Sequence, residues 1–331
     1  MRSEAAGIDL ADVRRLRHRL REWLIRTPVV RCKNLEQRLG GDMSISAKLE
    51  FLQRTGTFKP RGALSVILGL DRKQLEAGVT AVSAGNHAIA TAFAAKVMGT
   101  SAKVVMTAAA NPWRVERCGH FGAEVVLAED VHSAFLLAEE IRETEGRFLV
   151  HPFEGSDVVR GTATLGMEIC EQVPGFDTVI VPIGGGGLCA GIASAARQLN
   201  PGCTVLGVEP EGADTMYRSF AAGAPQAIDR VRTIADSLGA PFALPLSYAL
   251  CRANVDRIVL VSDNELREAM GLLFTDLRVA VEPACAASTA ALMGPLSATL
   301  AGQRVVLVLC GSNIDWPSFE KEAGLGLSRA A

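Results

Sequence analysis

One lysine of this sequence stands between an aromatic residue and a proline, as Phe58-Lys59-Pro60. Proline fixes its own φ, biases the residue before it away from helical angles, and suits the first position of a helix, which the apolar run 63–68 continues. At a helix entrance the macrodipole, together with desolvation by Phe58, disfavours a charged ammonium. Lys59 would therefore lose its proton easily and could attack an aldehyde. The alternative is an ordinary solvated lysine beside a capped helix.

A run of four glycines offers a phosphate-binding turn. It lies between an apolar strand expected over 178–183 and a helix expected over 188–199. Glycines leave backbone amides uncovered, and a helix N-terminus adds positive potential, so the turn can hold a phosphate. It lacks the Lys-Ser/Thr pair of a P-loop, which argues against triphosphate chemistry. The four residues are Gly184, Gly185, Gly186 and Gly187.

The same turn also fits a dinucleotide-binding motif. Gly185, Gly187 and Ala190 supply the pattern G-x-G-x-x-A. Glu209 ends the next strand at about the distance from which a carboxylate binds a ribose hydroxyl. A dinucleotide-dependent oxidoreductase is therefore an open alternative, although it leaves Lys59 without a role. A non-catalytic cofactor-binding protein is open as well.

A second turn follows another short strand and opens an alanine-rich helix. It consists of Ser83, Ala84, Gly85, Asn86 and His87. Open α/β sheets bind ligands at this end of their strands. The amides of the turn can hold a carboxylate, while Asn86 can donate a hydrogen bond to a phenolate-type oxygen. His87 is a candidate general base, but a histidine in the first turn of a helix is more often a packed residue, and we favour that interpretation.

Strands and helices alternate along the chain, and this order predicts an α/β fold with parallel sheets. An amphipathic helix is expected over 9–25. No internal repeat or low-complexity linker is present, so the domains pack closely or interrupt one another in sequence. Strands are predicted at 29–31, 44–50, 79–82, 103–106, 124–126, 147–150, 178–183, 204–209, 257–261 and 305–309.

Composition limits the class of protein. A chain of 331 residues that is 49% hydrophobic can bury a large core. Its 34 basic and 36 acidic residues give a net charge of −2, so we expect no nucleic acid and no anionic membrane as a partner. No apolar run reaches transmembrane length, and residues 1–4 lack a signal-peptide core. The eight irregularly spaced cysteines indicate reduced thiols, and we expect a cytoplasmic protein.

Together these motifs resemble the fold-type II pyridoxal-phosphate enzymes. Within them the sequence is most similar to the serine/threonine dehydratase and serine racemase group, in its short form without a regulatory domain. The resemblance extends over nearly the whole chain, with several ordered motifs at family spacing. They lie at 27–28, 58–63, 83–87, 184–188, 281–283 and 310–313.

The resemblance implies roles for the first motifs. Lys59 is the catalytic lysine that binds the cofactor aldehyde covalently, and Phe58 lies against the cofactor ring. Asn86 bonds the ring hydroxyl. The turn from Ser83 to His87 holds the carboxylate of an amino acid substrate.

The resemblance also implies the rest of the cofactor wall. The glycine run and Leu188 hold the phosphate, and Glu282 lies nearby. Cys310 meets the pyridine nitrogen, with Ser312 as the second choice, because the sequence Cys-Gly-Ser-Asn departs from the commoner Ser-Gly-Gly-Asn. A thiol or hydroxyl cannot keep the pyridine protonated as a carboxylate would, so the ring is a weaker electron sink and β-elimination is favoured over a long-lived carbanion.

The resemblance further implies a two-domain α/β fold like that of the tryptophan synthase β chain, with parallel-rich sheets and flanking helices. Residues 1–65 and 151–331 are expected to form the large domain that binds pyridoxal 5'-phosphate. Residues 66–150 are expected to form a small mobile domain. The resemblance also implies a homodimer.

The activity implied is that of an ammonia-lyase. It would eliminate water from L-threonine, L-serine or a related 3-hydroxy amino acid, giving a 2-oxo acid and ammonia. Another β-elimination or replacement, or racemisation, is the alternative. Racemases of the group have a serine where this chain has Ala84, which favours elimination. The run 160–164 also departs from the family pattern, so we expect the substrate pocket to differ.

Relatives often bind a divalent cation through an acidic residue, a backbone carbonyl and a second acidic residue. Glu209 and the carbonyl of Ala213 match the first two ligands. Thr215 stands where the second acid is expected, although Asp214 is adjacent. Losing one carboxylate weakens a site for a hard cation, so we expect weak or absent dependence on magnesium or calcium.

Overall fold

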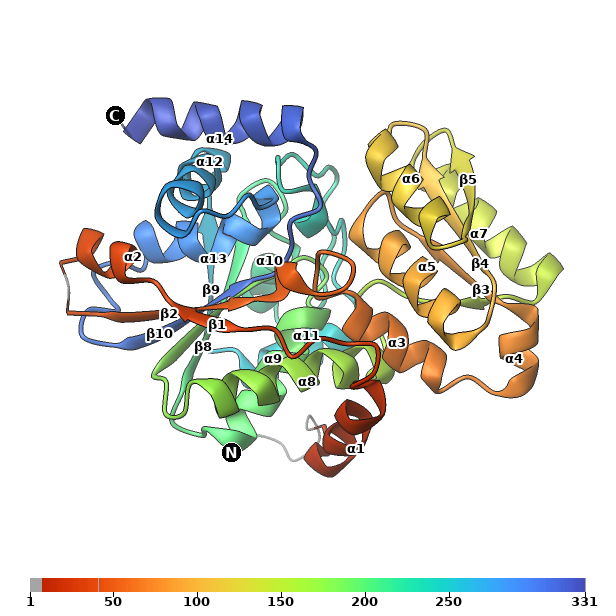
Figure 1. Ribbon diagram of the computed structural model, residues 1–331, viewed down its shortest axis with the longest axis horizontal. Coiled ribbons are helices and arrows are strands. Elements are labelled where there is room, and N and C mark those ends of the chain that lie inside the picture. The colour runs from red at the N-terminus through yellow and green to blue at the C-terminus, as the bar shows by residue number, and fades with distance from the viewer. Residues whose placement is uncertain (1–7, 41, 331) are drawn as a thin grey trace.

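The computed structural model describes residues 8–40 and 42–330, so residues 1–4, on which the expectation about a signal peptide rests, lie outside it. The chain forms two sheets flanked by helices (Figure 1). The six-stranded sheet has the order β1-β2-β10-β7-β8-β9, and the four-stranded sheet has the order β5-β4-β3-β6. Only the pairing of β1 with β2 is antiparallel among these strands. The predicted α/β class with parallel-rich sheets is confirmed.

Every predicted strand is present, with ends that differ from the prediction by at most two residues. The strands are β1 (Val29–Arg31), β2 (Ser44–Leu49), β3 (Val79–Val82), β4 (Ala102–Thr107), β5 (Glu124–Ala128), β6 (Phe148–Leu149), β7 (Thr178–Pro182), β8 (Thr204–Pro210), β9 (Arg257–Val261) and β10 (Arg304–Leu309).

The helices fill the intervals between these strands. They are α1 (Leu10–Leu20), α2 (Lys33–Arg38), α3 (Pro60–Leu68), α4 (Arg72–Ala77), α5 (Asn86–Met98), α6 (Pro112–His120), α7 (Val131–Glu145), α8 (Ser156–Gln172), α9 (Gly187–Leu199), α10 (Thr215–Ala222), α11 (Pro245–Asn254), α12 (Asp263–Leu272), α13 (Pro283–Met293) and α14 (Trp316–Ala330), with short turns η1 (Glu50–Leu52), η2 (Asp236–Leu238) and η3 (Leu273–Leu277).

The first helix is shorter than predicted. It ends at Leu20 rather than near Ile25, because both backbone groups of Ile25 bond to the side chain of Gln53, at 2.9 Å and 2.8 Å. A side chain that satisfies a backbone N–H and C=O replaces the next helical turn. The segment that leads into β1 is thereby held against the turn before Lys59.

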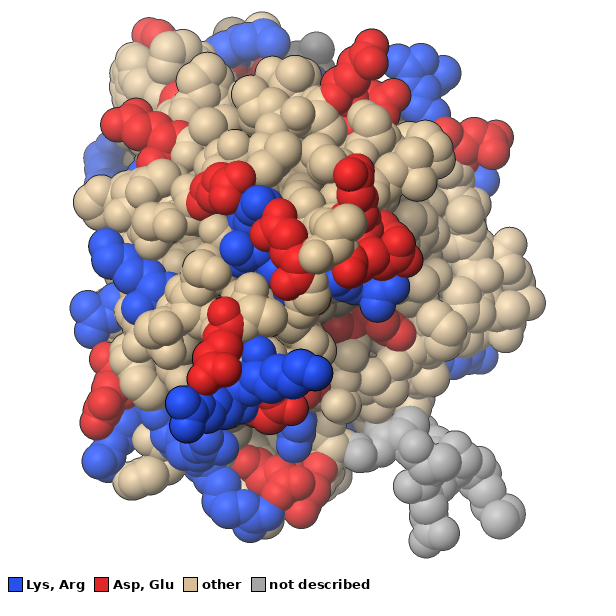
Figure 2. All heavy atoms as spheres, turned by 90° about the vertical axis from the view of Figure 1, so that its right-hand side faces the viewer, with Lys and Arg blue, Asp and Glu red and all other residues tan. Residues whose placement is uncertain are grey.

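We call the six-stranded sheet with its helices the large lobe, and the four-stranded sheet with α4 to α7 the small lobe. Helices α8 and α9 cover one face of the large sheet, and α12 and α13 cover the other (Figure 1). Acidic and basic side chains are interspersed on the outer face of the small lobe, without a large field of one sign (Figure 2). Among the described residues, no helix is both long and apolar enough to cross a membrane.

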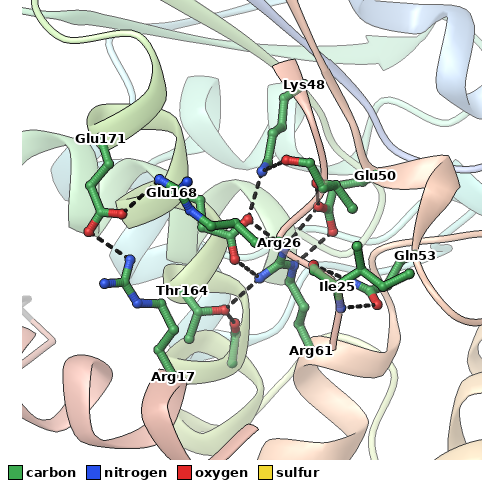
Figure 3. A network of polar contacts seen from close by, with 12 residues as sticks. Arg17, Ile25, Arg26, Lys48, Glu50, Gln53, Arg61, Thr164, Glu168 and Glu171 are labelled. Carbon is green, nitrogen blue, oxygen red and sulfur yellow. Dashed lines mark hydrogen bonds and ion pairs between the residues drawn. The ribbon is translucent and has the colours of Figure 1, made fainter. Parts of the chain in front are cut away.

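Four buried charged side chains hold α3 in place, and we call them the buried ion network: Lys48, Glu50, Arg61 and Glu168 (Figure 3). Arg61 donates to Glu50 at 2.7 Å and to Glu168 at 2.8 Å. Lys48 donates to Glu168 at 2.6 Å. Two cations thus balance two carboxylates, and each side chain has at least two hydrogen-bond partners, which is the condition under which buried charges are tolerated. The network ties β2 and η1 to α3 and α8.

Replacing Glu168 with Gln should destabilise the fold strongly. The variant leaves Lys48 and Arg61 buried with only one carboxylate between them, and we expect the free energy of unfolding to fall by about 3 kcal/mol. Urea unfolding followed by circular dichroism measures this change. The control is Glu76→Gln in the exposed Arg72–Glu76 pair, whose side chains are 92% and 65% accessible, and it should change stability little. Equal stability of the two variants would contradict the role of the network.

Candidate active site

Lys59 lies directly before the first turn of α3. Contrary to the expected bias from Pro60, its own backbone is helical, with φ −53° and ψ −33°. The reason is that the turn closes at this residue: Ala63 N donates to the Lys59 carbonyl, and Lys59 N donates to Thr57 Oγ1, both at 3.2 Å. The predicted helix entrance is therefore present and is anchored one residue earlier than expected.

The segment before Lys59 is joined to the end of β10. Phe58 N donates to the carbonyl of Cys310 at 3.1 Å, and Thr57 forms a β-bridge with Gly311. These contacts bring the N-terminal and C-terminal parts of the large lobe to the same place. The lysine and the cysteine of the predicted site are therefore neighbours in the fold.

The Lys59 amine is enclosed. Its Nζ donates to the Pro152 carbonyl at 2.7 Å and lies 5.2 Å from the centre of the Phe58 ring. Burial lowers the pKa of Lys59 to about 8, because the charged form is poorly solvated there. About a tenth of this amine is therefore neutral at pH 7, far more than for an ordinary lysine, and this form can act as a nucleophile or a base.

The glycine run forms the predicted turn between β7 and α9. Gly186 has a φ of +95°, which side chains rarely adopt. A Cβ atom on Gly185 would lie 2.1 Å from the ring of Phe153, and one on Gly187 would lie 2.4 Å from the Phe153 carbonyl oxygen. The turn thus needs glycine for its conformation and for close approach. The first amides of α9, including that of Leu188, are the donors that a phosphate could use.

The amide of Asn86 lies at the centre of a buried polar cluster. Its Nδ2 donates to both carboxylate oxygens of Glu282, at 2.8 Å and 3.0 Å, and to Ser237 Oγ at 3.1 Å. Its Oδ1 accepts from Asn313 Nδ2 at 2.8 Å, which orients the amide. Burial raises the pKa of Glu282 to about 7. Both predicted residues, Asn86 and Glu282, are therefore in one cluster, and the contributions of Ser237 and Asn313 were not foreseen.

Cys310 and Ser312, the two candidates for the pyridine partner, differ in their position relative to the smaller of two adjoining cavities. A cavity of about 40 Å³ is lined by Phe58, Lys59, Asn86, the glycine run, Glu282 and Cys310, among others, whereas Ser312 is not among its lining residues. Instead, Ser312 N donates to the Gly56 carbonyl at 2.9 Å. A hydrogen bond with Cys285, together with burial, raises the pKa of the Cys310 thiol. A neutral thiol therefore faces this cavity.

A second cavity, of about 290 Å³, adjoins the first, because Lys59, Asn86, Phe153, Gly185 and Ser237 line both. The predicted turn of Ser83, Ala84, Gly85, Asn86 and His87 forms part of its wall. Phe153 is also part of the wall, as are residues that the sequence did not single out, among them Arg114, Phe135, Asp236 and Phe242. The two cavities are parts of one site between the lobes.

His87 is a packed residue, as the preferred interpretation held. It is 4% exposed, and its Nε2 lies 2.7 Å from the Val150 carbonyl oxygen. Burial lowers the pKa of His87 to about 3, so the ring is neutral and most useful as a link between α5 and the end of the small sheet.

The run 160–164 does not line the larger cavity, but its Thr162 lines a small pocket beside Lys59. The run lies within α8, which stands between the Lys59 motif and the glycine run in the sequence. A Cβ on Gly161 would lie 2.1 Å from the Arg61 carbonyl oxygen, so glycine lets α3 approach α8 closely. Thr162 Oγ1 donates to the Gly187 carbonyl at 2.8 Å. The run therefore positions both Lys59 and the glycine turn.

The side chain of Glu209 accepts hydrogen bonds from backbone amides in the protein interior. Its side chain is fully buried, and its two oxygens accept from Met216 N at 2.9 Å and Tyr217 N at 2.7 Å, at the start of α10. Burial raises the pKa of this carboxyl to about 8. No ribose hydroxyl can reach it there, which removes the carboxylate on which the dinucleotide alternative depended.

The predicted cation ligands are likewise placed in the interior. Ala213 is fully buried, and Asp214 pairs with Arg218 at 2.8 Å instead of joining Glu209. Thr215 Oγ1 donates to the Ala240 carbonyl at 3.3 Å. In the part of the chain that the structure describes, no three His, Cys, Asp or Glu side chains gather as a metal site.

An amine with a lowered pKa, a glycine cradle and a neutral thiol on one cavity wall are groups that can together hold pyridoxal phosphate. The amine can bind its aldehyde, the cradle can take its phosphate, and Asn86 and Cys310 can meet its ring edge. The site therefore fits this cofactor, and it defines the class of enzyme.

Comparison with known proteins gives the family. The family model described as "Pyridoxal-phosphate dependent enzyme" matches residues 20–311, and the chain belongs to this family. The fold and class expected from the sequence motifs are thereby confirmed.

Individual relatives cover nearly the full chain. Phenylserine dehydratase of Ralstonia pickettii is 54% identical over 318 residues, covering 96% of this chain and 97% of its own. L-threonine ammonia-lyase of Thermotoga maritima is 33% identical, covering 98% and 80%. The structure of maize serine racemase superimposes with a TM-score of 0.90 at 33% identity, covering 98% of this chain and 99% of its own.

We predict that this enzyme depends little on divalent cations. Both oxygens of Glu209 already accept backbone amides, and Asp214 is paired with Arg218, so a hard cation would have to break these contacts. Activity and the thermal unfolding midpoint should be nearly unchanged after treatment with EDTA. A marked loss of either that added magnesium restores would contradict the prediction.

Proposed function

We propose that this chain is an ammonia-lyase that dehydrates a 3-hydroxy amino acid to a 2-oxo acid and ammonia, using pyridoxal phosphate. One observation carries the proposal: the Lys59 amine, the glycine turn and the Cys310 thiol line one cavity. The relatives named as phenylserine dehydratase and L-threonine ammonia-lyase support the same reaction class.

The cofactor would be held by residues from several elements. The glycine turn and Leu188 would take the phosphate, Phe58 would lie against the ring, and Asn86 and Cys310 would meet its polar edge. When bound, pyridoxal phosphate withdraws electrons from the substrate α-carbon. A thiol, unlike a carboxylate, does not keep a pyridine nitrogen protonated, and the resulting moderate electron withdrawal suits elimination of a β-substituent.

Lys59 would carry the proton chemistry. Its lowered pKa makes the neutral amine easier to reach, and this form can take the α-proton of the substrate. Lys59 lines the same cavity as Asn86. The substrate loses this proton and its β-hydroxyl, which departs as water. Water then converts the unsaturated amine to the 2-oxo acid and releases ammonia.

The first turn of α5 would bind the substrate carboxylate. The amides at a helix N-terminus have no partner within the helix and attract anions. Ser83 Oγ accepts from Gly85 N at 3.1 Å, which shapes the turn without using those amides. The substrate α-carbon would then lie between this turn and Lys59, both of which line the larger cavity.

We extend the proposal to domain movement, oligomeric state and cellular location. Residues 66–150 would move as a small domain over the substrate, against a large domain formed by 1–65 and 151–331, since the site lies between the two lobes. A homodimer in the cytoplasm is proposed as well. For the location, the support is that the eight cysteines are all free, which fits a reducing compartment.

Replacing Lys59 with Ala should abolish the covalent attachment of the cofactor. The wild-type protein should be yellow, and borohydride should fix one cofactor per chain, located at Lys59 by peptide mass spectrometry. The variant should lose both the fixed label and turnover, while Lys73→Ala, on the exposed start of α4, should keep both. Wild-type elimination rates in the Lys59 variant would overturn the assignment.

Racemase is the second candidate, because of the similarity to maize serine racemase. Racemisation needs an acid on the side of the substrate opposite Lys59, and the methyl group of Ala84 cannot supply a proton there. We therefore predict that L-serine yields ammonia with negligible D-serine. Chiral chromatography with ammonia measured in parallel tests this, and the variant Ala84→Ser serves as the comparison. D-serine appearing as fast as ammonia from the wild-type protein would favour the racemase.

A further inference from the structure

The larger cavity has a mostly apolar wall at its outer part. Alongside the polar turn of α5, the lining includes small and medium apolar side chains and three phenylalanines, and the volume is about 290 Å³. A site for serine or threonine has only a hydrogen atom or a methyl group to cover at the β-carbon. Among the apolar lining residues are Val82, Val105, Phe135, Phe153, Pro241 and Phe242.

The three rings form a continuous group across the cleft. Phe135 belongs to α7 of the small lobe, and Phe242 belongs to the loop before α11 of the large lobe. Their ring centres are 6.5 Å apart with planes tilted by 54°, and Phe242 lies 6.4 Å from Phe153 with a tilt of 52°. These spacings and tilts are in the range at which aromatic rings attract one another. A further ring could join the group in the same way.

Phe135 lies both on the cavity wall and at the surface of the molecule. Its side chain is 40% exposed, although the small lobe has its own core under α7. Single exposed apolar residues are common on proteins, but Phe135 lines the cavity together with Phe153 and Phe242, so a ligand in this cavity would meet apolar surface there.

Two charged groups of the wall, Arg114 and Asp236, form an ion pair with each other. Arg114 donates to Asp236 and, at 3.0 Å, to the Asn313 carbonyl. Arg114 is therefore not free to bind an acidic side chain of a substrate, and Asp236 would repel one. The wall consequently disfavours an acidic substituent and accepts an uncharged ring.

We infer that the substrate carries an aryl group on its β-carbon, and that Phe135 and Phe242 are specificity-determining residues that enclose this group. The inference rests on the proposed dehydration of a 3-hydroxy amino acid and names its substrate class. Phe153 lies at the inner end of the group, against Gly185, and separates the aryl site from the glycine turn.

The test compares 3-phenylserine with L-threonine as substrates of the holoenzyme. We expect Phe135→Ala and Phe242→Ala each to lower kcat/KM for phenylserine about tenfold, through loss of ring contact, and to change kcat/KM for threonine less than about twofold. Leu136→Ala is the matched control, because Leu136 is the next residue of α7, is 59% exposed and does not line the cavity. This control should leave both substrates unchanged.

A binding measurement separates this inference from the proposed function. L-phenylalanine has the ring but no β-hydroxyl, so its dissociation constant, read from the change in cofactor absorbance and compared with that of L-alanine, reports ring binding without turnover. Tighter binding of phenylalanine that weakens about tenfold in Phe135→Ala supports the aryl site even if no substrate is dehydrated.

Two outcomes would overturn the aryl site while leaving the dehydratase intact. One is a wild-type protein that dehydrates threonine and binds phenylalanine no more tightly than alanine. The other is an equal loss for both substrates in the two phenylalanine variants. Because Phe135 is partly exposed, its alanine variant should fold, and a thermal melt like that of the Leu136 variant verifies this.

Discussion

The position of the reactive lysine depends on charges that never touch the substrate. The buried ion network holds Arg61, two residues beyond Lys59, between Glu50 and Glu168, and Lys48 completes the charge balance. Removing a charge from such a group is costly because its partners stay buried. The network therefore fixes β2, α3 and α8 relative to one another. Because Lys59 directly precedes α3, this arrangement also fixes the position of the lysine.

Most of the fold was predictable from the sequence because local signals and long-range packing agree in it. Short apolar strands with glycine turns and alanine-rich helices define parallel α/β units, and their observed ends lie close to the predicted ones. The exception is the end of α1, where the side chain of Gln53 replaces the next turn of helix. A contact between residues far apart in sequence leaves no periodic signal, so the pattern alone could not locate this end.

The candidate site was predictable where its residues lie within one short sequence motif. Lys59, Asn86 and the glycine run lie on turns that open helices, and such turns have recognisable spacing. The cavity wall was not predictable, because Arg114, Phe135 and Phe242 come from separate elements that the fold brings together. The same is true of Glu209, whose spacing suggests a ligand-binding carboxylate but whose oxygens are used by the amides of α10. Spacing along the chain does not report which partner a buried carboxylate finds.

The contact between Phe153 and Gly185 couples the larger cavity to the glycine turn. A side chain on Gly185 would collide with the Phe153 ring, so Gly185 cannot gain a side chain while Phe153 is present. Neither Phe135 nor Phe242 makes such a close contact with the glycine turn. New substrate ranges in this lineage should therefore arise more readily through changes at the outer rings, on α7 and on the loop before α11, than at the inner ring, which packs against the glycine turn. Laboratory libraries for altered substrate range are best directed at Phe135 and Phe242.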